Sequence, residues 1–162
     1  MRDISFLRQP LSDPYLQLIN HFESEGWDTV DPEPEHKIIH LSYKGKHAEY
    51  RCAAAVRGEP LVAQFFTIVP AAIPAKKRAA IAEFTVRANF GMMIGRFEMG
   101  WDERHLRFQA ASHLPEGKFN DQMMRWIIGQ SITAVETYFP AIMAILFGGA
   151  TPEDAVGDVE GR

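Results

Sequence analysis

The chain has 162 residues, of which 46% are hydrophobic and 23% are charged, a balance typical of one folded domain rather than of a disordered protein. Its net charge of −4 opposes binding to nucleic acid or to an anionic membrane unless a basic patch forms locally. Cys52 is the only cysteine, which excludes an internal disulfide and any zinc site built on several thiolates.

The N-terminal residues do not resemble a secretory signal, because Asp3, Arg8 and Pro10 interrupt the few apolar residues there. The longest apolar run, 139–147, contains Pro140 and is far shorter than the ~20 residues of a membrane-spanning helix. We therefore expect a cytoplasmic protein that does not enter a membrane.

The first predicted element is a helix from about Pro14 to Glu25. Asp13 can cap its N-terminus, Gly26 can end it, and four apolar residues at i, i+3, i+4 and i+7 form one stripe: Tyr15, Leu18, Ile19 and Phe22. The next segment, 31–35, contains two prolines and is predicted to be a linker without regular structure.

Three strands of an antiparallel meander follow, each with apolar residues at every second position. A turn at 44–47 would pair Leu41 with Tyr50 and Ile39 with Cys52, and a turn at Gly58-Glu59 would set Phe65 behind Cys52. The other face of the third strand is unusual for a solvated surface, because it carries Val62, Gln64, Phe66 and Ile68, with Ala53 and Ala55 beside it. Something should cover this second face, either the third helix of the same chain or another protein.

A second helix is predicted from about Pro74 to Asn89, with Ile81, Phe84 and Ala88 facing inward and a basic start at 76–78. A hairpin from about Met93 to Ser112 follows, in which Phe97 meets Phe108, Met99 meets Leu106 and Glu98 meets Arg107.

The third helix is predicted from Asn120 or Asp121 to Phe147. Met123, Ile127, Ala134 and Tyr138 form its apolar stripe, and Pro140 should kink or restart it. Thr151 to Asp154 reads as the cap and first turn of a short extra helix. The whole pattern predicts a single α+β domain over residues 12–156, with a lead-in at 1–11 and a flexible tail at 157–162.

Short motifs occur at the ends of the helices and within the strands: Gly26-Trp27, Tyr50-Arg51-Cys52, Asn89, Gly95-Arg96-Phe97 and Leu106-Arg107-Phe108. Their order and spacing over residues 12–156 resemble the YbjN family of bacterial proteins, described as sensory transduction regulators. The resemblance implies the fold of type III secretion chaperones, in the order helix, three-strand meander, helix, two-strand hairpin and long C-terminal helix. It also implies a cytoplasmic, often dimeric module without catalytic residues.

The residues themselves indicate no catalytic, cofactor or metal site. The histidines at 40, 47, 105 and 113 lack ligand spacing, and His40 is expected to face Arg51. Cys52 points to the same face as Tyr50 and is interpreted as a buried apolar residue rather than as a nucleophile.

We therefore predict a non-enzymatic, chaperone-like regulatory module that binds itself as a homodimer and also binds an unidentified protein. Its candidate interface joins the second sheet face to the apolar end of the third helix: Val62, Phe66, Ile68, Ile142, Met143, Leu146 and Phe147. One alternative is a small-ligand sensor or enzyme with a pocket between sheet and helices, although the sequence shows no convergent polar groups for it. The other is binding of nucleic acid through Lys76, Lys77 and Arg78, which the net negative charge does not favour.

Overall fold

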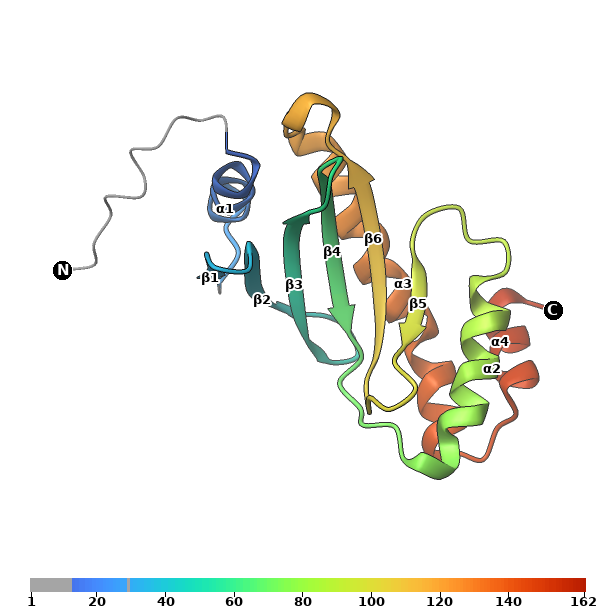
Figure 1. The fold of residues 1–162 in the computed structure, drawn as a ribbon. Coiled ribbons are helices and arrows are strands. Elements are labelled where there is room, and N and C mark those ends of the chain that lie inside the picture. The colour runs from blue at the N-terminus through green and yellow to red at the C-terminus, as the bar shows by residue number, and fades with distance from the viewer. Residues whose placement is uncertain (1–12, 29) are drawn as a thin grey trace.

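The computed structural model describes residues 13–28 and 30–162, and six antiparallel strands form its centre (Figure 1). The strands lie side by side in the order β1-β2-β3-β4-β6-β5. Their bounds are Val30–Glu33 for β1, Ile38–Lys44 for β2, Glu49–Arg57 for β3, Val62–Ile68 for β4, Arg96–Met99 for β5 and Leu106–His113 for β6. The predicted α+β class is confirmed, and the pairing of β6 with β4 joins the meander and the hairpin into one sheet.

The strand registers were predicted with mixed success. The β5–β6 hairpin is confirmed, with Phe97 opposite Phe108 and an Arg107–Glu98 hydrogen bond on the other face. The β2–β3 register was wrong by two residues, because Leu41 pairs with Cys52 rather than with Tyr50. The β3–β4 register is shifted by two residues in the same way. A shift of two keeps every side chain on its predicted face, so the two faces of the meander were assigned correctly.

The segment predicted to be a linker contains the edge strand β1, which pairs with β2 and places Pro32 opposite Ile39. The prediction was wrong because a proline is compatible with an edge strand, where its missing N–H leaves no ladder bond unmade. His40 consequently lies opposite Asp31 and Ala53, not opposite Arg51, and its Nε2 atom is 2.8 Å from a carboxylate oxygen of Glu33.

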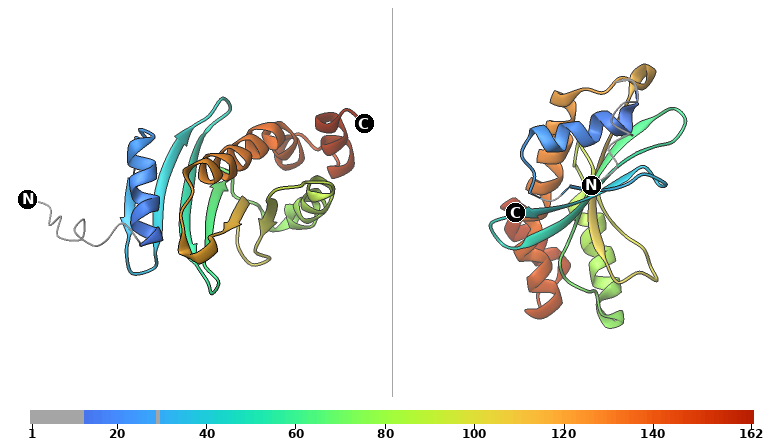
Figure 2. Two further views of the ribbon diagram at one scale, coloured as in Figure 1. Left: turned by 90° about the horizontal axis from the view of Figure 1, so that it is seen from above. Right: turned by 90° about the vertical axis from the view of Figure 1, so that its left-hand side faces the viewer.

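The helices are α1 (Pro14–Ser24), α2 (Arg78–Asn89), α3 (Asp121–Phe147) and α4 (Pro152–Glu160), with short 3-10 turns η2 (Ala75–Lys77) and η3 (Pro115–Gly117). They form a helix layer on one side of the sheet, which α2 and α4 extend beyond the β5 edge (Figure 2). A hydrogen bond of 2.8 Å between the buried hydroxyls of Thr67 and Ser131 fixes α3 against β4. The core therefore lies between α1, α3 and the Phe65 side of the sheet.

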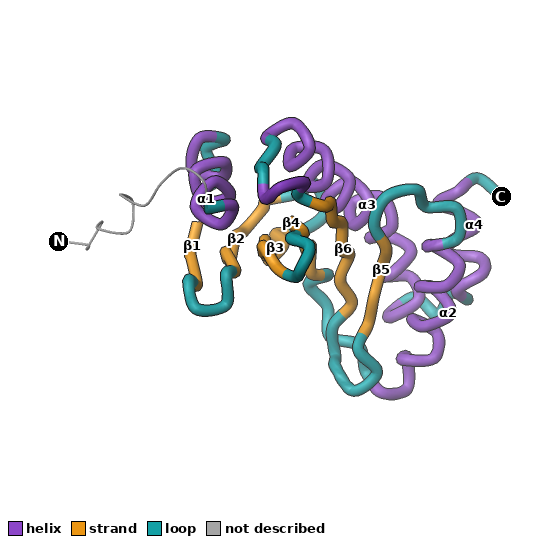
Figure 3. The backbone as a smooth tube through the Cα atoms, turned by 45° about the horizontal axis from the view of Figure 1, so that its top comes forward, coloured by secondary structure: helices purple, strands orange, loops and turns teal. Residues whose placement is uncertain are grey.

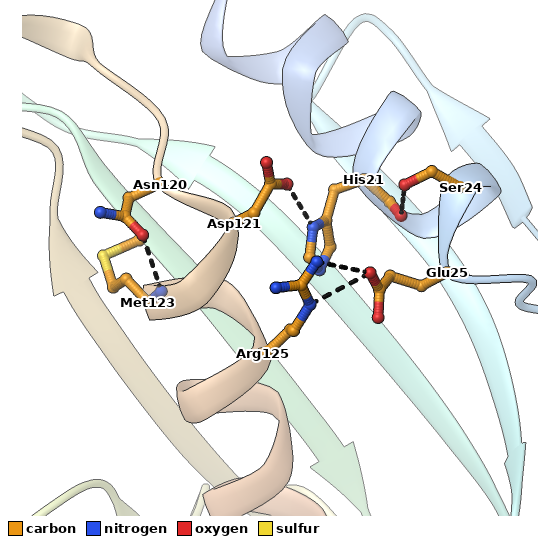
Figure 4. Close-up of polar contacts among 7 residues, drawn as sticks. All are labelled: His21, Ser24, Glu25, Asn120, Asp121, Met123 and Arg125. Carbon is orange, nitrogen blue, oxygen red and sulfur yellow. Dashed lines mark hydrogen bonds and ion pairs between the residues drawn. The ribbon is translucent and has the colours of Figure 1, made fainter.

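Polar contacts join the two helices that cover this face (Figure 4). The buried imidazole of His21 on α1 is hydrogen-bonded through Nδ1 to the carboxylate of Asp121 at the start of α3, at 2.7 Å. One turn further along, Arg125 donates to Glu25, and this ion pair lowers the pKa of the Glu25 carboxyl. These contacts hold α1 and α3 together as one layer.

The C-terminal part differs from its prediction in two respects. α3 runs through Pro140 as one helix instead of restarting there. The short extra helix is confirmed, with Thr151 as its cap, but it continues to Glu160, whose carboxylate accepts a hydrogen bond from the Tyr138 hydroxyl. Residues 157–160 are therefore helical, against the expectation of a tail from 157, whereas the predicted lead-in at 1–11 lies outside the described residues.

By length and composition α3 is the one helix of the described chain that could cross a membrane, with a mean hydropathy of 1.2 over its best window. Its most buried side chains, however, pack against the sheet and the other helices, as expected for the core helix of a folded domain.

Candidate protein-binding surfaces

The side of the sheet that faces away from the helix layer is not covered by any described helix. Because side chains alternate along each strand, the residues beside Phe65 and Thr67 in β4 point to this side. We define the open face by the residues that meet there in register from β3, β4 and β6: Ala53, Ala55, Val62, Gln64, Phe66, Ile68, Gln109 and Ala111. The second face identified in the sequence is therefore not covered by the third helix, which packs on the opposite side.

Phe66 lies at the centre of the open face, opposite Ala53 on one neighbouring strand and Gln109 on the other. Only 9% of Phe66 is exposed, because the guanidinium of Arg107 lies 4.6 Å from the centre of its ring. Arg107 is in turn held by two hydrogen-bond contacts of 2.6–2.7 Å to Glu98 on β5. The aromatic ring is thus covered by a surface side chain, and this cover can move without unfolding a helix.

Charged side chains surround the apolar centre unevenly. Arg51, Arg57, Arg96 and Arg107 extend from the central strands and β5, where the acidic residues on the same face are Glu49 and Glu98. Within the described chain, Arg51 and Arg57 have no ion-pair partner. The open face is therefore locally basic on a chain whose net charge is −4, and it is complementary to an apolar surface that carries acidic groups.

Several large apolar side chains are also exposed on the helix layer, and the sequence analysis did not identify them. Val86, Phe90, Met93 and Trp126 are all large apolar residues with more than half of their surface exposed. Met93 and Trp126 stand at a groove of about 410 Å³ between α3 and the loop that joins α2 to β5, a loop visible beside α3 in Figure 3. The sequence does contain one indication of these exposed residues, because Val86 and Trp126 fall outside the apolar stripes of α2 and α3.

Comparison with known proteins places the chain in a family. The family model for YbjN, whose description is "Putative bacterial sensory transduction regulator", matches residues 16–144. This chain belongs to the YbjN family. A solved structure titled "Crystal structure of YbjN, a putative transcription regulator from E. coli" has the same fold, with a TM-score of 0.55 and 11% identity. The match covers 78% of this chain and 89% of that one. A comparison with curated proteins returned no match.

Membership of the YbjN family confirms the resemblance drawn from the strand and helix motifs, and the family is described as a regulator rather than as an enzyme. Those motifs have structural roles in this chain. The Asn89 side chain, for example, accepts from the Phe97 amide at 2.7 Å and donates to the Phe97 carbonyl at 2.9 Å, which ties the end of α2 to β5. Gly95 has a φ of +72°, and a Cβ atom there would lie 2.4 Å from the Phe108 ring. Asn89 and Gly95 therefore position the elements of the fold.

The seven residues predicted to form one interface lie on two sides of this YbjN-family chain. Val62, Phe66 and Ile68 are on the open face. Ile142 and Leu146 are buried in the chain's own core and are therefore not accessible to a partner, which corrects that part of the set. Met143 is half-buried and Phe147 is exposed, but both belong to α3 in the helix layer. The two groups cannot contact one partner surface together.

The other candidate residues also have structural positions. Burial raises the pKa of the Cys52 thiol to about 12, so the thiol is protonated and faces the core as expected. In the described residues no group of three or more His, Cys, Asp or Glu is placed to hold a metal ion. The basic residues Lys76, Lys77 and Arg78 lie at the η2 turn and the first residue of α2.

Proposed function

We propose that this YbjN-family protein is a cytoplasmic, non-enzymatic regulatory module that acts by binding another protein through the open face. The observation that supports this most strongly is the absence of any described helix over a sheet face whose centre is apolar. A sheet face exposed only to water is expected to carry polar side chains at these positions. Here Val62, Phe66 and Ile68 occupy one strand, and alanines flank them.

The chemistry of the open face favours an apolar partner surface with acidic groups. Arg51 and Arg57 are free to form ion pairs with it, whereas the small side chain of the half-buried Ala53 allows close approach to the strands. Contact with Phe66 requires Arg107 to move aside or to pair with the partner instead of with Glu98. Arg107 can therefore contribute to recognition, since an acidic group of the partner can replace Glu98 as its acceptor. This mode of binding resembles a chaperone-like role in which the sheet face receives a client.

A photo-cross-linking amino acid placed at Ile68 or at Val62 tests this proposal in cells of the source organism. Both side chains are half-buried on the open face, so the probe lies at the proposed contact without replacing a core residue. The same probe at Ala79, which is exposed on α2, is the matched control. We expect one dominant protein adduct from the two open-face positions and none of that mass from the control position.

Substitutions on the open face then separate the contribution of charge to partner binding from that of apolar contact. Ile68→Glu and Arg57→Glu should each remove the adduct formed from Val62, whereas Ala79→Glu should not. Adducts that form equally from all three probe positions would refute the proposal. Adducts that disappear on nuclease treatment would also refute it, because the partner would then be nucleic acid, and binding should in that case weaken steeply with salt.

A further inference from the structure

The dimensions and charges of the open face restrict which element of a partner can cover it. We infer that this element is an amphipathic α-helix of about four turns, which lies along β4 and carries acidic residues near both of its ends. The helix belongs to the partner whose binding is proposed above, so the inference rests on that function and specifies the partner segment more closely.

Apolar side chains follow β4 along the open face. Val62 and Ile68 are six residues apart in this strand, which corresponds to about 20 Å, and Phe66 lies between them. We call these three residues the apolar track. The positions beside its middle on β3 and β6 are uncharged: Ala53, Ala55, Gln109 and Ala111. Three neighbouring strands are about 10 Å wide, which is close to the diameter of one α-helix, so the apolar track and its flanks match a single helix along β4.

The backbone hydrogen-bonding groups of β4 are directed to its two neighbours, because β4 pairs with β3 on one side and with β6 on the other. An extended partner segment lying on this face would therefore bury its own amides and carbonyls without hydrogen-bond partners. A helix bonds its backbone groups internally and presents only side chains. The opposite side of the same sheet shows this solution, since α3 packs there against β4 and β6 (Figure 1).

Arginines stand at both ends of the apolar track. On β3, Arg57 lies opposite Val62 and Arg51 lies opposite Ile68, and within the described chain neither arginine has an ion-pair partner. On β6, Arg107 lies opposite Ile68 as well. The acidic residues on this side of the sheet lie outside the apolar track: Asp31, Glu33, Glu49 and Glu98. A helix with Asp or Glu near each end can therefore pair with arginines at both ends, whereas a basic helix would be repelled at both.

The photo-cross-linking probes at Val62 and Ile68 measure the geometry of the bound segment once the adducts are digested and mapped by mass spectrometry. A distance of about 20 Å corresponds to about 13 residues of helix, and the positions nearest to this that fall on one helix face are roughly 11 and 14 residues apart. We expect the partner residues joined to the two probes to have one of these spacings. A third probe at the half-buried Gln64 should map roughly three or four residues from the Val62 contact.

A synthetic peptide of the mapped segment tests the helix and its charges separately, with fluorescence anisotropy as the readout. Proline at a central, outward position of the peptide should raise the Kd at least about a hundredfold, whereas alanine at the same position should not. Arg51→Glu and Arg57→Glu in the full chain should each raise the Kd at least about tenfold, because acidic peptide groups would then meet a carboxylate. Lys76→Glu, a charge reversal at an exposed position of η2, is the matched control and should leave the Kd unchanged. Circular dichroism should show the three variants folded, since each replaced side chain is exposed.

Several results would overturn the inference and leave the open face as the partner site. One is a spacing of about six residues between the contacts of Val62 and Ile68, which would mean an extended segment. Another is a pair of contacts far apart in the partner sequence, which would mean a folded surface. A third is an equal effect of proline and alanine, and a fourth is a Kd that neither arginine reversal changes. Failure of the proposed function looks different, because no adduct would then be specific to the open-face probes, and the partner helix would fall with it.

Discussion

Two adjacent phenylalanines in β4 provide a direct test of which face of the sheet is open. Phe65 is fully buried under the helix layer, with its ring about 6 Å from those of Phe22 and Trp27. Phe65→Ala should leave an enclosed cavity and cost about 4 kcal/mol of unfolding free energy. Phe66 has nearly the same burial, but its cover is the Arg107 guanidinium. Phe66→Ala should cost only about 2 kcal/mol, because Arg107 and water can fill the space and no cavity remains.

Urea denaturation followed by circular dichroism measures both losses under one condition. With a slope of about 2 kcal/mol per molar urea, the difference between the two variants corresponds to a midpoint shift of about 1 M. The two substitutions are chemically identical and one residue apart, so each is the control for the other. Equal losses would mean that Phe66 is enclosed as tightly as Phe65, and the open face, together with the function proposed for it, would then be wrong.

Three further predictions concern contacts that hold the helix layer in place. Thr67→Val leaves the buried Ser131 hydroxyl without its partner and should cost about 1–3 kcal/mol, and adding Ser131→Ala should recover part of that loss in urea denaturation. Asn89→Ala removes both hydrogen bonds to the Phe97 backbone and should cost about 2 kcal/mol, measured in the same way. Partial burial raises the pKa of Glu136, but neighbouring donors, including two backbone amides of the β2–β3 turn, bring it below the usual value. Because the folded-state pKa of Glu136 is lowered, the ionised carboxylate stabilises the fold at pH values above the unfolded pKa of about 4.3. The wild type should therefore be more stable than Glu136→Gln at pH 7, and this difference should disappear as the pH falls through the folded pKa.

The sequence predicted best where two independent patterns agreed. In the β5–β6 hairpin an apolar pair on one face and the Glu98–Arg107 pair on the other are satisfied together by one register, and that register is the observed one. In the β2–β3 hairpin both faces lack such a charge pair near the centre, so registers that differ by two residues fit the apolar pattern equally well. The turn decides between them, and the amide of Gly45 bonds to the carbonyl of Ala48 in the observed one.

The edge strand and the helix-layer surface were missed for different physical reasons. A proline such as Pro32 normally predicts that no strand is present. A strand tolerates it here only because β1 lies at the edge of the sheet. Val86 and Trp126 look like ordinary surface residues of α2 and α3 taken separately, because single exposed apolar residues are common. The groove beside Trp126 depends on the loop that carries Met93 to the side of α3, and this is a tertiary contact that no local pattern contains.

The candidate interface combined residues that the fold separates, for a related reason. The second face of β4 and the end of α3 each carry more apolar residues than an element exposed to water usually does. The sequence alone does not show which of these two sets is buried in the core of the same chain. The structure uses Ile142 and Leu146 in the core and leaves Phe66 under a single arginine. An excess of apolar residues thus indicates a packed neighbour, but only topology shows whether that neighbour belongs to the same chain.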